Sequence, residues 1–356
     1  MLRYAARLAV FLAVPLSSAC SAGAQEEPAR VILFVADGAG TGHWTAARLT
    51  IEDPAFLHLP ALGLIDTRGS DHTVTESAAS ATALATGVRT QEHMISLGPD
   101  SMPRRTVLEL AAERGRSTGL VTTTLLTDAT PAAFCAHYDS RNHAELAKQM
   151  AVAGVTVLMG GGRAWFWRVQ DRDSTRLLER IQRDYSYVDT DSAFYALDPD
   201  TLDNLAGLFA ERDMQLAPER SPSLAAMTET ALAILGRNPR GFFLMVENEE
   251  TDTQAHENQP FGVIAREMRA FDDAIRVGLE YQMRHPETLI VVLGDHETGG
   301  LSIVTDRDGE PEARYTTTGH TAAMLPVFAG GPGADQFRGI IPNYRVGELL
   351  MDAVGR

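Results

Sequence analysis

Apolar and polar positions follow two periodicities along most of the chain. Residues 30–37, RVILFVAD, form a continuous apolar run that ends in an acid, which is typical of a strand buried on both faces of a sheet. Similar short runs occur at 118–124, 155–162, 241–248 and 288–296, and each follows a stretch with apolar residues at helical spacing. The pattern therefore predicts strands that alternate with helices.

This alternation predicts an α/β fold: a single domain with a mainly parallel central sheet flanked by helices on both faces. Residues 165–222 and 300–318 are the least regular stretches, and we interpret both as excursions from that domain. In sheets of this kind, ligands bind outside the carboxyl ends of the strands. Chemically active residues are therefore expected at the ends of the runs 30–37, 241–248 and 288–296.

The composition is that of a globular protein without a basic surface. The 356 residues are 44% hydrophobic and 22% charged, and the formal net charge is -16. Such an acidic balance argues against a nucleic-acid partner or an anionic membrane surface, both of which require clustered Lys and Arg. An anionic substrate would need local positive charge from metal ions or an arginine.

The first residues have the pattern of an export signal. Two arginines precede the apolar stretch 8–16, which is too short to span a bilayer. Residues 1–24 are interpreted as a signal peptide and residues 25–356 as the single folded domain, with a lipoprotein signal and a lipid anchor at Cys20 as the alternative. No later stretch is apolar enough to cross a membrane. The sequence therefore predicts a periplasmic or secreted protein.

Acids and histidines gather after the predicted strands. Each of them alone is more often structural than chemical. Together, carboxylate and imidazole groups are the ligands that Zn²⁺ takes in hydrolytic sites with an open position. The residues that stand out are Asp37, Glu247, Asp252, His256, Asp295, His296 and His320.

The stretch VTESAASATA, residues 74–83, places Ser77 at the start of a run of small residues. A helix start of this kind lets an oxyanion approach the backbone N–H groups. The ordinary interpretation is that Ser77 only caps a helix. As a nucleophile it would need a base or a metal to activate it, and no GxSxG motif of an α/β-hydrolase surrounds it. Activation by a metal ion therefore remains.

The stretch LTDATPAAFCAHYDSRNH, residues 126–143, adds Asp128, Thr130 and Arg141. A threonine before proline at a helix start is normally a cap, and an arginine here can be a surface residue. If Arg141 points into the site, its planar guanidinium suits two oxygens of a phosphoryl group.

These segments together resemble the alkaline phosphatases. VTESAASATA is similar to the nucleophile motif of that family, and six further segments occur in the family's order. They are VADGAG, DATPAAFCAHYDSR, MGGGR, MVENEETDTQAH, LGDHETGG and GHTAAMLPVFAGGPGA. The resemblance covers residues 30–337.

Position by position, the resemblance implies two zinc ions, one magnesium ion, a serine nucleophile and an arginine clamp. Asp252, His256 and His320 would hold one zinc, and Asp37, Asp295, His296 and Ser77 the other. Asp37, Thr130 and Glu247 would hold magnesium, and Arg141 would bind phosphate. Glu76, Asp128 and Thr253 would lie next to these ligands.

The implied activity is that of an exported alkaline phosphatase, which hydrolyses small phosphate monoesters through a phosphoserine at Ser77. Metal ions would lower the pKa of Ser77 and stabilise the leaving oxygen, so no histidine base is needed beside it. The alternatives are a phosphodiesterase of the same superfamily and a catalytically inactive, metal-dependent binding protein. The Arg141 segment favours monoesters, because it would take the space of a diester's second group.

The chain departs from the family pattern in several places. Glu76 stands where many members have Asp, so its reach toward Arg141 is expected to differ. Thr253 stands where bacterial relatives often have Lys and animal relatives His, so a usual contact to phosphate is expected to be missing. Asp128 matches the bacterial relatives that bind magnesium. The stretch between the last two histidine ligands is short, so dimer contacts are expected to be reduced and a homodimer stays an open expectation.

Overall fold

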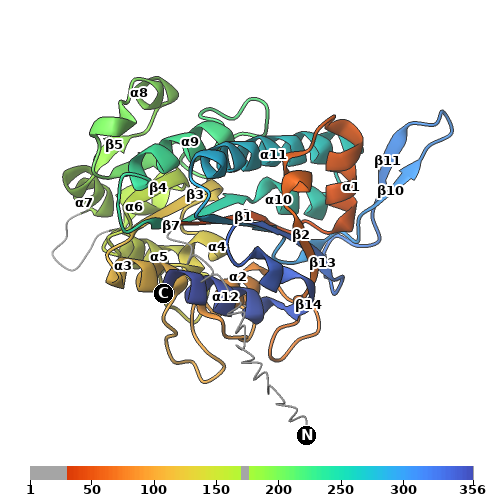
Figure 1. Ribbon diagram of the computed structural model, residues 1–356, viewed down its shortest axis with the longest axis horizontal. Coiled ribbons are helices and arrows are strands. Elements are labelled where there is room, and N and C mark those ends of the chain that lie inside the picture. The colour runs from red at the N-terminus through yellow and green to blue at the C-terminus, as the bar shows by residue number, and fades with distance from the viewer. Residues whose placement is uncertain (1–29, 170–175, 356) are drawn as a thin grey trace, which may run out of the picture.

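The computed structural model describes residues 30–169 and 176–355, so the predicted signal and Cys20 lie outside the described residues. A ten-stranded sheet divides this part of the chain into two helical layers (Figure 1). In spatial order its strands are β14 (Gly339–Pro342), β2 (Ala61–Asp66), β13 (Leu325–Gly330), β8 (Thr288–Leu293), β1 (Arg30–Ala36), β7 (Phe242–Asn248), β3 (Ser117–Leu125), β4 (Val157–Gly161), β6 (Leu205–Leu208) and β5 (Ser186–Val188).

The sheet is parallel throughout its centre. β1 pairs in parallel with β7 on one side and with β8 on the other, and β3 continues the parallel order beyond β7. β13 is antiparallel to both of its neighbours, β2 and β8. The prediction of a mainly parallel sheet between helices is confirmed. The central strands are buried on both faces, which explains their unbroken apolar runs.

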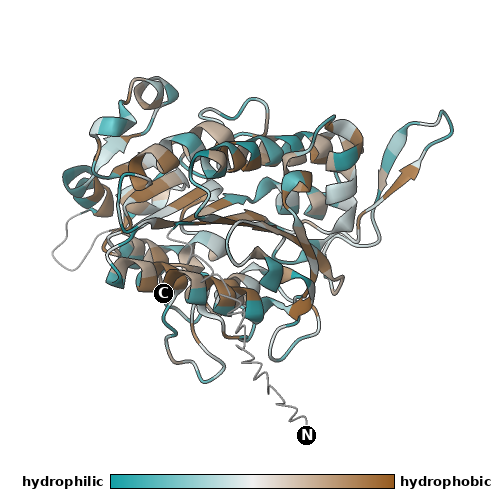
Figure 2. Ribbon diagram, viewed as in Figure 1, coloured by the Kyte–Doolittle hydropathy of each residue, from teal (hydrophilic) through white to brown (hydrophobic). Residues whose placement is uncertain are grey.

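Each face of the sheet is covered by its own hydrophobic core, and Figure 2 shows the apolar positions turned toward the sheet. One layer contains α2 (Ser77–Thr86), α3 (Val107–Glu113), α4 (Ala129–Ala133), α5 (His143–Met150), α6 (Arg163–Arg168), α7 (Leu177–Asp184) and α12 (Asn343–Gly355). The other contains α1 (Thr41–Thr50), the short helix η1 (Ala55–His58), α8 (Asp191–Tyr195), α9 (Leu224–Leu235) and α11 (Phe261–Arg284).

The small residues of α2 are explained by its position. All ten residues of this helix are buried. A Cβ atom at Gly347 of α12 would lie only 2.2 Å from the backbone oxygen of Ala83, so the two helices cross in very close contact. Small side chains on both helices permit that crossing. The helix therefore runs through the interior and presents only its N-terminus, with Ser77, to the edge of the sheet.

The two irregular stretches differ from one another. Within 165–222, β6 and β5 join the central sheet as its outer strands. The prediction that this stretch is an excursion is therefore only partly right. Their apolar runs are only three and four residues long, too short for a clear periodicity. A single-turn helix, η2 (Pro199–Thr201), precedes β6.

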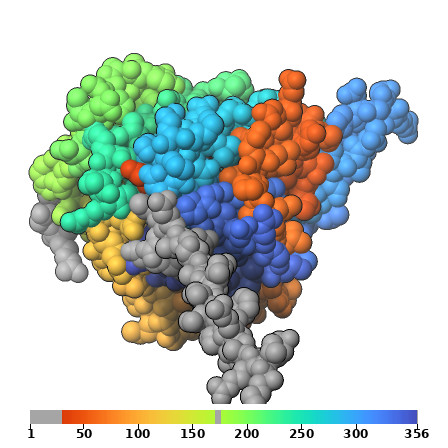
Figure 3. Space-filling view, viewed as in Figure 1, coloured from red at the N-terminus to blue at the C-terminus, as the bar shows by residue number. Residues whose placement is uncertain are grey.

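Residues 300–318 do form an excursion. β10 (Ser302–Thr305) and β11 (Pro311–Arg314) pair as a hairpin that stands out from the surface (Figure 3). At its base, β9 (Glu297–Thr298) pairs with β12 (His320–Thr321). Near the end of the chain lies a further short helix, η3 (Ala334–Phe337). Among the described residues, no helix combines the length and apolarity that crossing a membrane requires.

Candidate active site

The candidate active site lies where the central parallel strands end. β1 leads into Asp37, β7 contains Glu247 near its end, and β8 leads into Asp295 and His296. Because β1 pairs in parallel with β7 and β8, the three carboxyl ends meet at the same edge of the sheet. The helix α10 (Glu250–His256) follows β7 directly and brings further ligand candidates to this edge.

Asp37, Asp295 and His296 form one buried group of potential ligands. Nε2 of His296 lies 3.1 Å from Asp37 Oδ1 and 3.6 Å from Asp295 Oδ2. The ligand atoms of the three residues all lie within 4.8 Å of one another. Oγ of Ser77 lies 3.1 Å from the same Nε2, so the serine faces this group directly.

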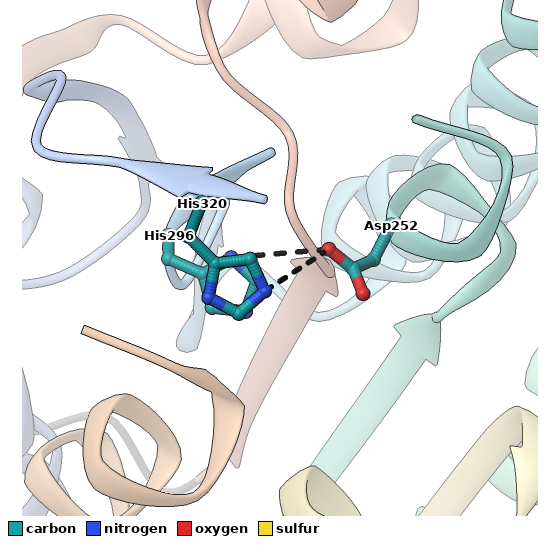
Figure 4. A group of neighbouring side chains, drawn as sticks. All are labelled: Asp252, His296 and His320. Carbon is teal, nitrogen blue, oxygen red and sulfur yellow. Dashed lines mark ion pairs between the residues drawn. The ribbon is translucent and has the colours of Figure 1, made fainter. Parts of the chain in front are cut away.

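Asp252, His256 and His320 form a second group beside the first. Nε2 of His256 lies 3.2 Å from Asp252 Oδ2 and 3.1 Å from His320 Nε2. Asp252 Oδ1 lies 3.8 Å from His320 Nε2 and 3.9 Å from His296 Nδ1 (Figure 4). The rings of His296 and His320 stack with their centroids 3.9 Å apart. His296 therefore lies between the two groups.

Backbone oxygens orient two of these imidazoles. Nδ1 of His256 donates to the carbonyl oxygen of Thr318 at 2.5 Å, and Nδ1 of His320 donates to that of Thr75 at 2.9 Å. A ring that donates from Nδ1 keeps the lone pair of Nε2 free for a metal. Both Nε2 atoms face Asp252, so the donor atoms are arranged as in a metal site.

A third group of oxygens lies on the other side of Asp37. Oγ1 of Thr130 donates to Asp37 Oδ2 across 3.3 Å. Oε2 of Glu247 accepts from Thr122 at 2.5 Å. Burial and then the charge of Asp37 raise the pKa of Glu247 well above its usual range. Carboxylate and hydroxyl oxygens are what Mg²⁺ prefers.

Three carboxylate oxygens at this edge are buried without a hydrogen-bond partner among the described residues. They are Glu247 Oε1 and the two oxygens that face the imidazole of His296, Asp37 Oδ1 at 3.1 Å and Asp295 Oδ2 at 3.6 Å from its Nε2. Burial and then the charge of Asp37 also raise the pKa of Asp295 well above its usual range. Buried like charges with free oxygens are costly unless cations compensate them. These residues therefore form a set of donors whose charge bound metal ions would compensate.

The protonation of His296 bears on how Ser77 can be activated. Burial would lower the pKa of His296, but the charges of Asp295 and Asp37 outweigh it and raise that pKa to about 10. At neutral pH without metals the imidazole is therefore protonated, and a protonated imidazole cannot accept the proton of Ser77. The 3.1 Å contact between them is thus unsuited to a serine–histidine base pair.

Arg141 lies at the open side of the site. Its Nη2 donates to Asp128 Oδ1 at 2.7 Å, while its Nη1 is 3.7 Å from Glu76 Oε2. The carboxylate of Glu76 instead accepts from the backbone N–H groups of Ala78, Ala79 and His93. Burial would lower the pKa of Arg141, but these two acids and Asp37 raise it. The guanidinium is therefore a fixed positive charge among carboxylates.

The side chain of Thr253 points toward Glu249, the residue just before α10. Its hydroxyl donates to Glu249 Oε1 at 2.6 Å. Burial and then the charges of Asp128 and Asp37 raise the pKa of Glu249 well above its usual range. Glu249 therefore lies among the carboxylates of the site, although its position in the sequence did not single it out. Nothing at position 253 offers a positive charge to a phosphate.

The sequence also did not single out the threonine hydroxyls that contact the candidate metal ligands. Besides Thr122, Thr251 donates to the backbone oxygen of Asp37 at 2.6 Å, and Thr298 donates to Asp252 Oδ1. Such contacts fix the directions of metal ligands. A signal was present in the sequence, since threonine is frequent in the segments TTTLLTDAT, ETDT and ETGG beside the predicted ligands.

Gly38 allows the ligand groups to approach each other. Its φ is +66°, and a Cβ atom there would lie 2.5 Å from Asp252 Oδ1 and 2.8 Å from Thr298 Oγ1. Its N–H donates to Asp295 Oδ1 at 3.1 Å. Only glycine fits this conformation and this close approach without strain.

This arrangement defines a class of protein. A mostly parallel sheet, carboxylates and imidazoles at its strand ends and a serine at the head of a buried helix are the features of an alkaline phosphatase-like fold. Residues 29–311 match the family described as Alkaline phosphatase. The chain therefore belongs to the alkaline phosphatase family, whose members are metal-dependent phosphatases.

Individual relatives agree with this assignment. Alkaline phosphatase 4 of Bacillus subtilis (strain 168) is 31% identical, with 88% of this chain and 86% of that protein covered. Streptomycin-6-phosphate phosphatase of Streptomyces griseus is 33% identical, with 98% and 95% covered. The solved structure of alkaline phosphatase from the Antarctic bacterium TAB5 has a TM-score of 0.85 at 29% identity, covering 93% of this chain and 98% of that one.

Proposed function

We propose that this phosphatase is an alkaline phosphatase that hydrolyses small phosphate monoesters through a phosphoserine at Ser77. The observation that carries the proposal is the position of Ser77 Oγ, 3.1 Å from His296 Nε2 and next to the group of Asp37 and Asp295. Two relatives that match most of this chain are named as phosphatases, and the name of the second gives a small phosphorylated compound as its substrate.

The proposal includes three metal ions, two zinc and one magnesium. Asp252, His256 and His320 would hold one zinc, Asp37, Asp295 and His296 the second, and Asp37, Thr130 and Glu247 the magnesium. The buried carboxylate oxygens without partners support these assignments. When bound, such ions supply positive charge that lowers the pKa of a hydroxyl and stabilises charge on phosphoryl oxygens.

Ser77 would attack phosphorus, and the bond from phosphorus to the ester oxygen would break as the new bond to Ser77 Oγ forms. Water would then release inorganic phosphate from the serine and restore the hydroxyl. Ser77 opens α2, so the positive end of the helix dipole would face the transferred group, but not every N–H group of the first turn is open to it. Glu76 already occupies two of those N–H groups and fixes the start of the helix.

Arg141 would bind two free oxygens of the phosphate. Its contact with Asp128 holds one side of the guanidinium and leaves donors on the other. A monoester presents three non-bridging oxygens, whereas a diester presents two and carries a second organic group. This difference supports the monoester over the diester as the substrate.

The decisive test compares chromogenic substrates. The purified protein is expected to hydrolyse 4-nitrophenyl phosphate far faster than bis(4-nitrophenyl) phosphate, and to leave 4-nitrophenyl sulfate unchanged. Initial rates of 4-nitrophenolate release at alkaline pH measure all three reactions. A higher kcat/KM for the diester would assign the protein to the phosphodiesterases, and no turnover of any substrate would favour a metal-dependent binding protein.

Replacing Arg141 by alanine is expected to lower kcat/KM for the monoester by about 10²-fold and for the diester by less. The reason is that a bidentate clamp gains most from a phosphate with two oxygens facing it. Steady-state kinetics on both substrates measure the two losses. An Arg105→Ala variant, which removes an exposed arginine paired with Glu113, serves as the control. Equal losses on the two substrates would contradict the role of Arg141.

Export and assembly remain proposals that rest on the sequence. The signal peptide 1–24, or the lipid anchor at Cys20, would place the protein in the periplasm or outside the cell. The sequence left a homodimer open because the stretch between His296 and His320 is short. In the structure that stretch carries one projecting hairpin.

A further inference from the structure

A cavity that is lined by none of the candidate ligand residues lies between the start of α9 and the first half of α11. Its volume is about 350 Å³, which is in the range of small-ligand pockets. Apolar atoms come from Ala217, Pro218, Leu224 and Ala270. We call it the α9 cavity. In Figure 1 the two helices run side by side on one face of the sheet.

Three arginines line the α9 cavity, in a protein whose formal net charge is -16. Arg266 and Arg269 are exposed residues three positions apart on α11, so they lie on the same side of that helix. Arg269 uses one N–H group to donate to the backbone oxygen of Thr50. One acid, Asp273, lines the cavity as well. With Glu267, which pairs with Arg220, three cationic groups stand against two anionic ones.

The third arginine has unused donors in the interior. Arg220 is only 4% exposed, and its Nη2 donates to Glu267 Oε2 at 2.9 Å. Its Nε and Nη1 are buried without a hydrogen-bond partner among residues 30–169 and 176–355. Both atoms are closed to solvent, so a group in the cavity interacts with the charge of Arg220 and gains hydrogen bonds from these atoms only if the side chain turns toward it.

The start of α9 adds a further source of positive potential. α9 has 12 residues, and the side chain of its N-cap, Ser223, accepts only from the N–H of Ala226. The N–H groups of Leu224 and Ala225 have no partner inside the helix, and both residues line the cavity. A helix N-terminus attracts anions, and here the buried Arg220, which pairs with Glu267 through one of its nitrogens, also lines the cavity.

We propose that the α9 cavity binds a small organic anion, with its acidic head near the arginines and the start of α9 and its apolar body against Ala217, Pro218 and Leu224. An acidic head alone would leave the apolar wall uncovered, and a neutral ligand would leave Arg266 and Arg269 without an anionic partner in the cavity. The site is separate from the proposed catalytic centre and does not depend on the proposed reaction.

A fluorescence titration of the metal-loaded protein with 2-naphthoate tests the site, because this probe joins a carboxylate to an aromatic body. We expect saturable binding of one naphthoate per chain. Arg266→Glu with Arg269→Glu is expected to weaken it at least tenfold, roughly the effect of losing charge-assisted contacts. Arg284→Glu, which changes an exposed arginine at the end of the same helix, is the matched control and is expected to bind normally.

Three further measurements distinguish binding in the α9 cavity from binding elsewhere on the protein. Ala225→Trp, which fills the cavity without removing a charge, is expected to abolish binding, and Arg141→Ala is expected to leave it unchanged. Neutral 2-naphthylmethanol is expected to bind at least tenfold more weakly than the anion. Loss of naphthoate binding in Arg141→Ala would place the probe in the catalytic centre and overturn the proposal. Equal binding of the neutral compound, or no saturable binding, would overturn it as well.

Discussion

Replacing Ser77 by alanine is expected to lower kcat/KM for a phosphate monoester by at least ~10³, about 4 kcal/mol of transition-state stabilisation. The side chain of Ser77 lies at the start of α2, and its Oγ faces His296. No other hydroxyl group was predicted to be the nucleophile. A small residual rate is expected, because the metal ligands and Arg141 remain in place to bind substrate.

Acid-quench trapping of labelled phosphate measures the covalent step directly. The wild-type protein is expected to retain one label per chain at acid pH, and Ser77→Ala none. Ser70→Ala, which changes an exposed serine before the same helix, is the matched control and is expected to retain the label. A label that still attaches to the Ser77→Ala protein would show that another residue is the nucleophile.

Removal of metal ions is expected to abolish activity and to make the protein unstable at alkaline pH. Burial and the charge of Asp37 raise the pKa values of Glu247 and Asp295, and neighbouring acids raise that of His296 to about 10. In the metal-free protein these groups therefore hold protons that the unfolded chain releases at lower pH. Folding then binds protons, and the free energy of unfolding falls as pH rises.

The pH window follows from the histidine. An unfolded His296 loses its proton near its ordinary pKa of 6.5, whereas the folded group keeps it up to about 10. Its contribution to stability is therefore complete below pH 6.5 and is lost as pH rises through 10. Burial and then the charge of His296 lower the pKa of His320. This shift destabilises the folded protein at acid pH, and the effect has disappeared by about pH 6.5, where the unfolded histidine also loses its proton. The metal-free protein should lose stability steadily above pH 6.5.

Bound metal ions replace those protons, so their effect on stability should increase with pH. Zinc and magnesium are expected to raise the melting temperature of the chelated protein by roughly 10 °C at pH 9, and by less at pH 6.5. Calorimetry with and without a chelator measures the shift, and chelator already saturated with metal is the control. Full activity in the metal-free protein, or a shift that does not depend on pH, would contradict the assigned metal groups.

The fold was largely predictable because its signals are local. Continuous apolar runs such as 30–37 and 288–296 have no polar face, and only strands buried on both sides of a sheet need such a pattern. β5 and β6 were not recognised, because three- and four-residue strands at an edge leave too short a pattern. Their membership of the sheet is decided by pairing with β4, which is a contact between distant parts of the chain.

By itself, the sequence determined the types of residue at the site and the strands after which they come. Acids and histidines after parallel strands must meet at one edge of a sheet, so residues such as Asp37 and Asp295 could be named without coordinates. The resemblance to a family supplied their grouping by metal ion. Spacing along the chain could not supply it, since Asp252 and His320 approach each other only after folding.

Only the tertiary structure decided where side chains point. It places His296 between the two ligand groups, turns Thr253 toward Glu249, and holds Glu76 on backbone N–H groups at 3.7 Å from Arg141. The small residues of α2 also gain their meaning there, from the close crossing with Gly347 of α12. The physical reason is that periodicity along a chain records burial, whereas the direction and protonation of a side chain depend on the neighbours that folding brings to it.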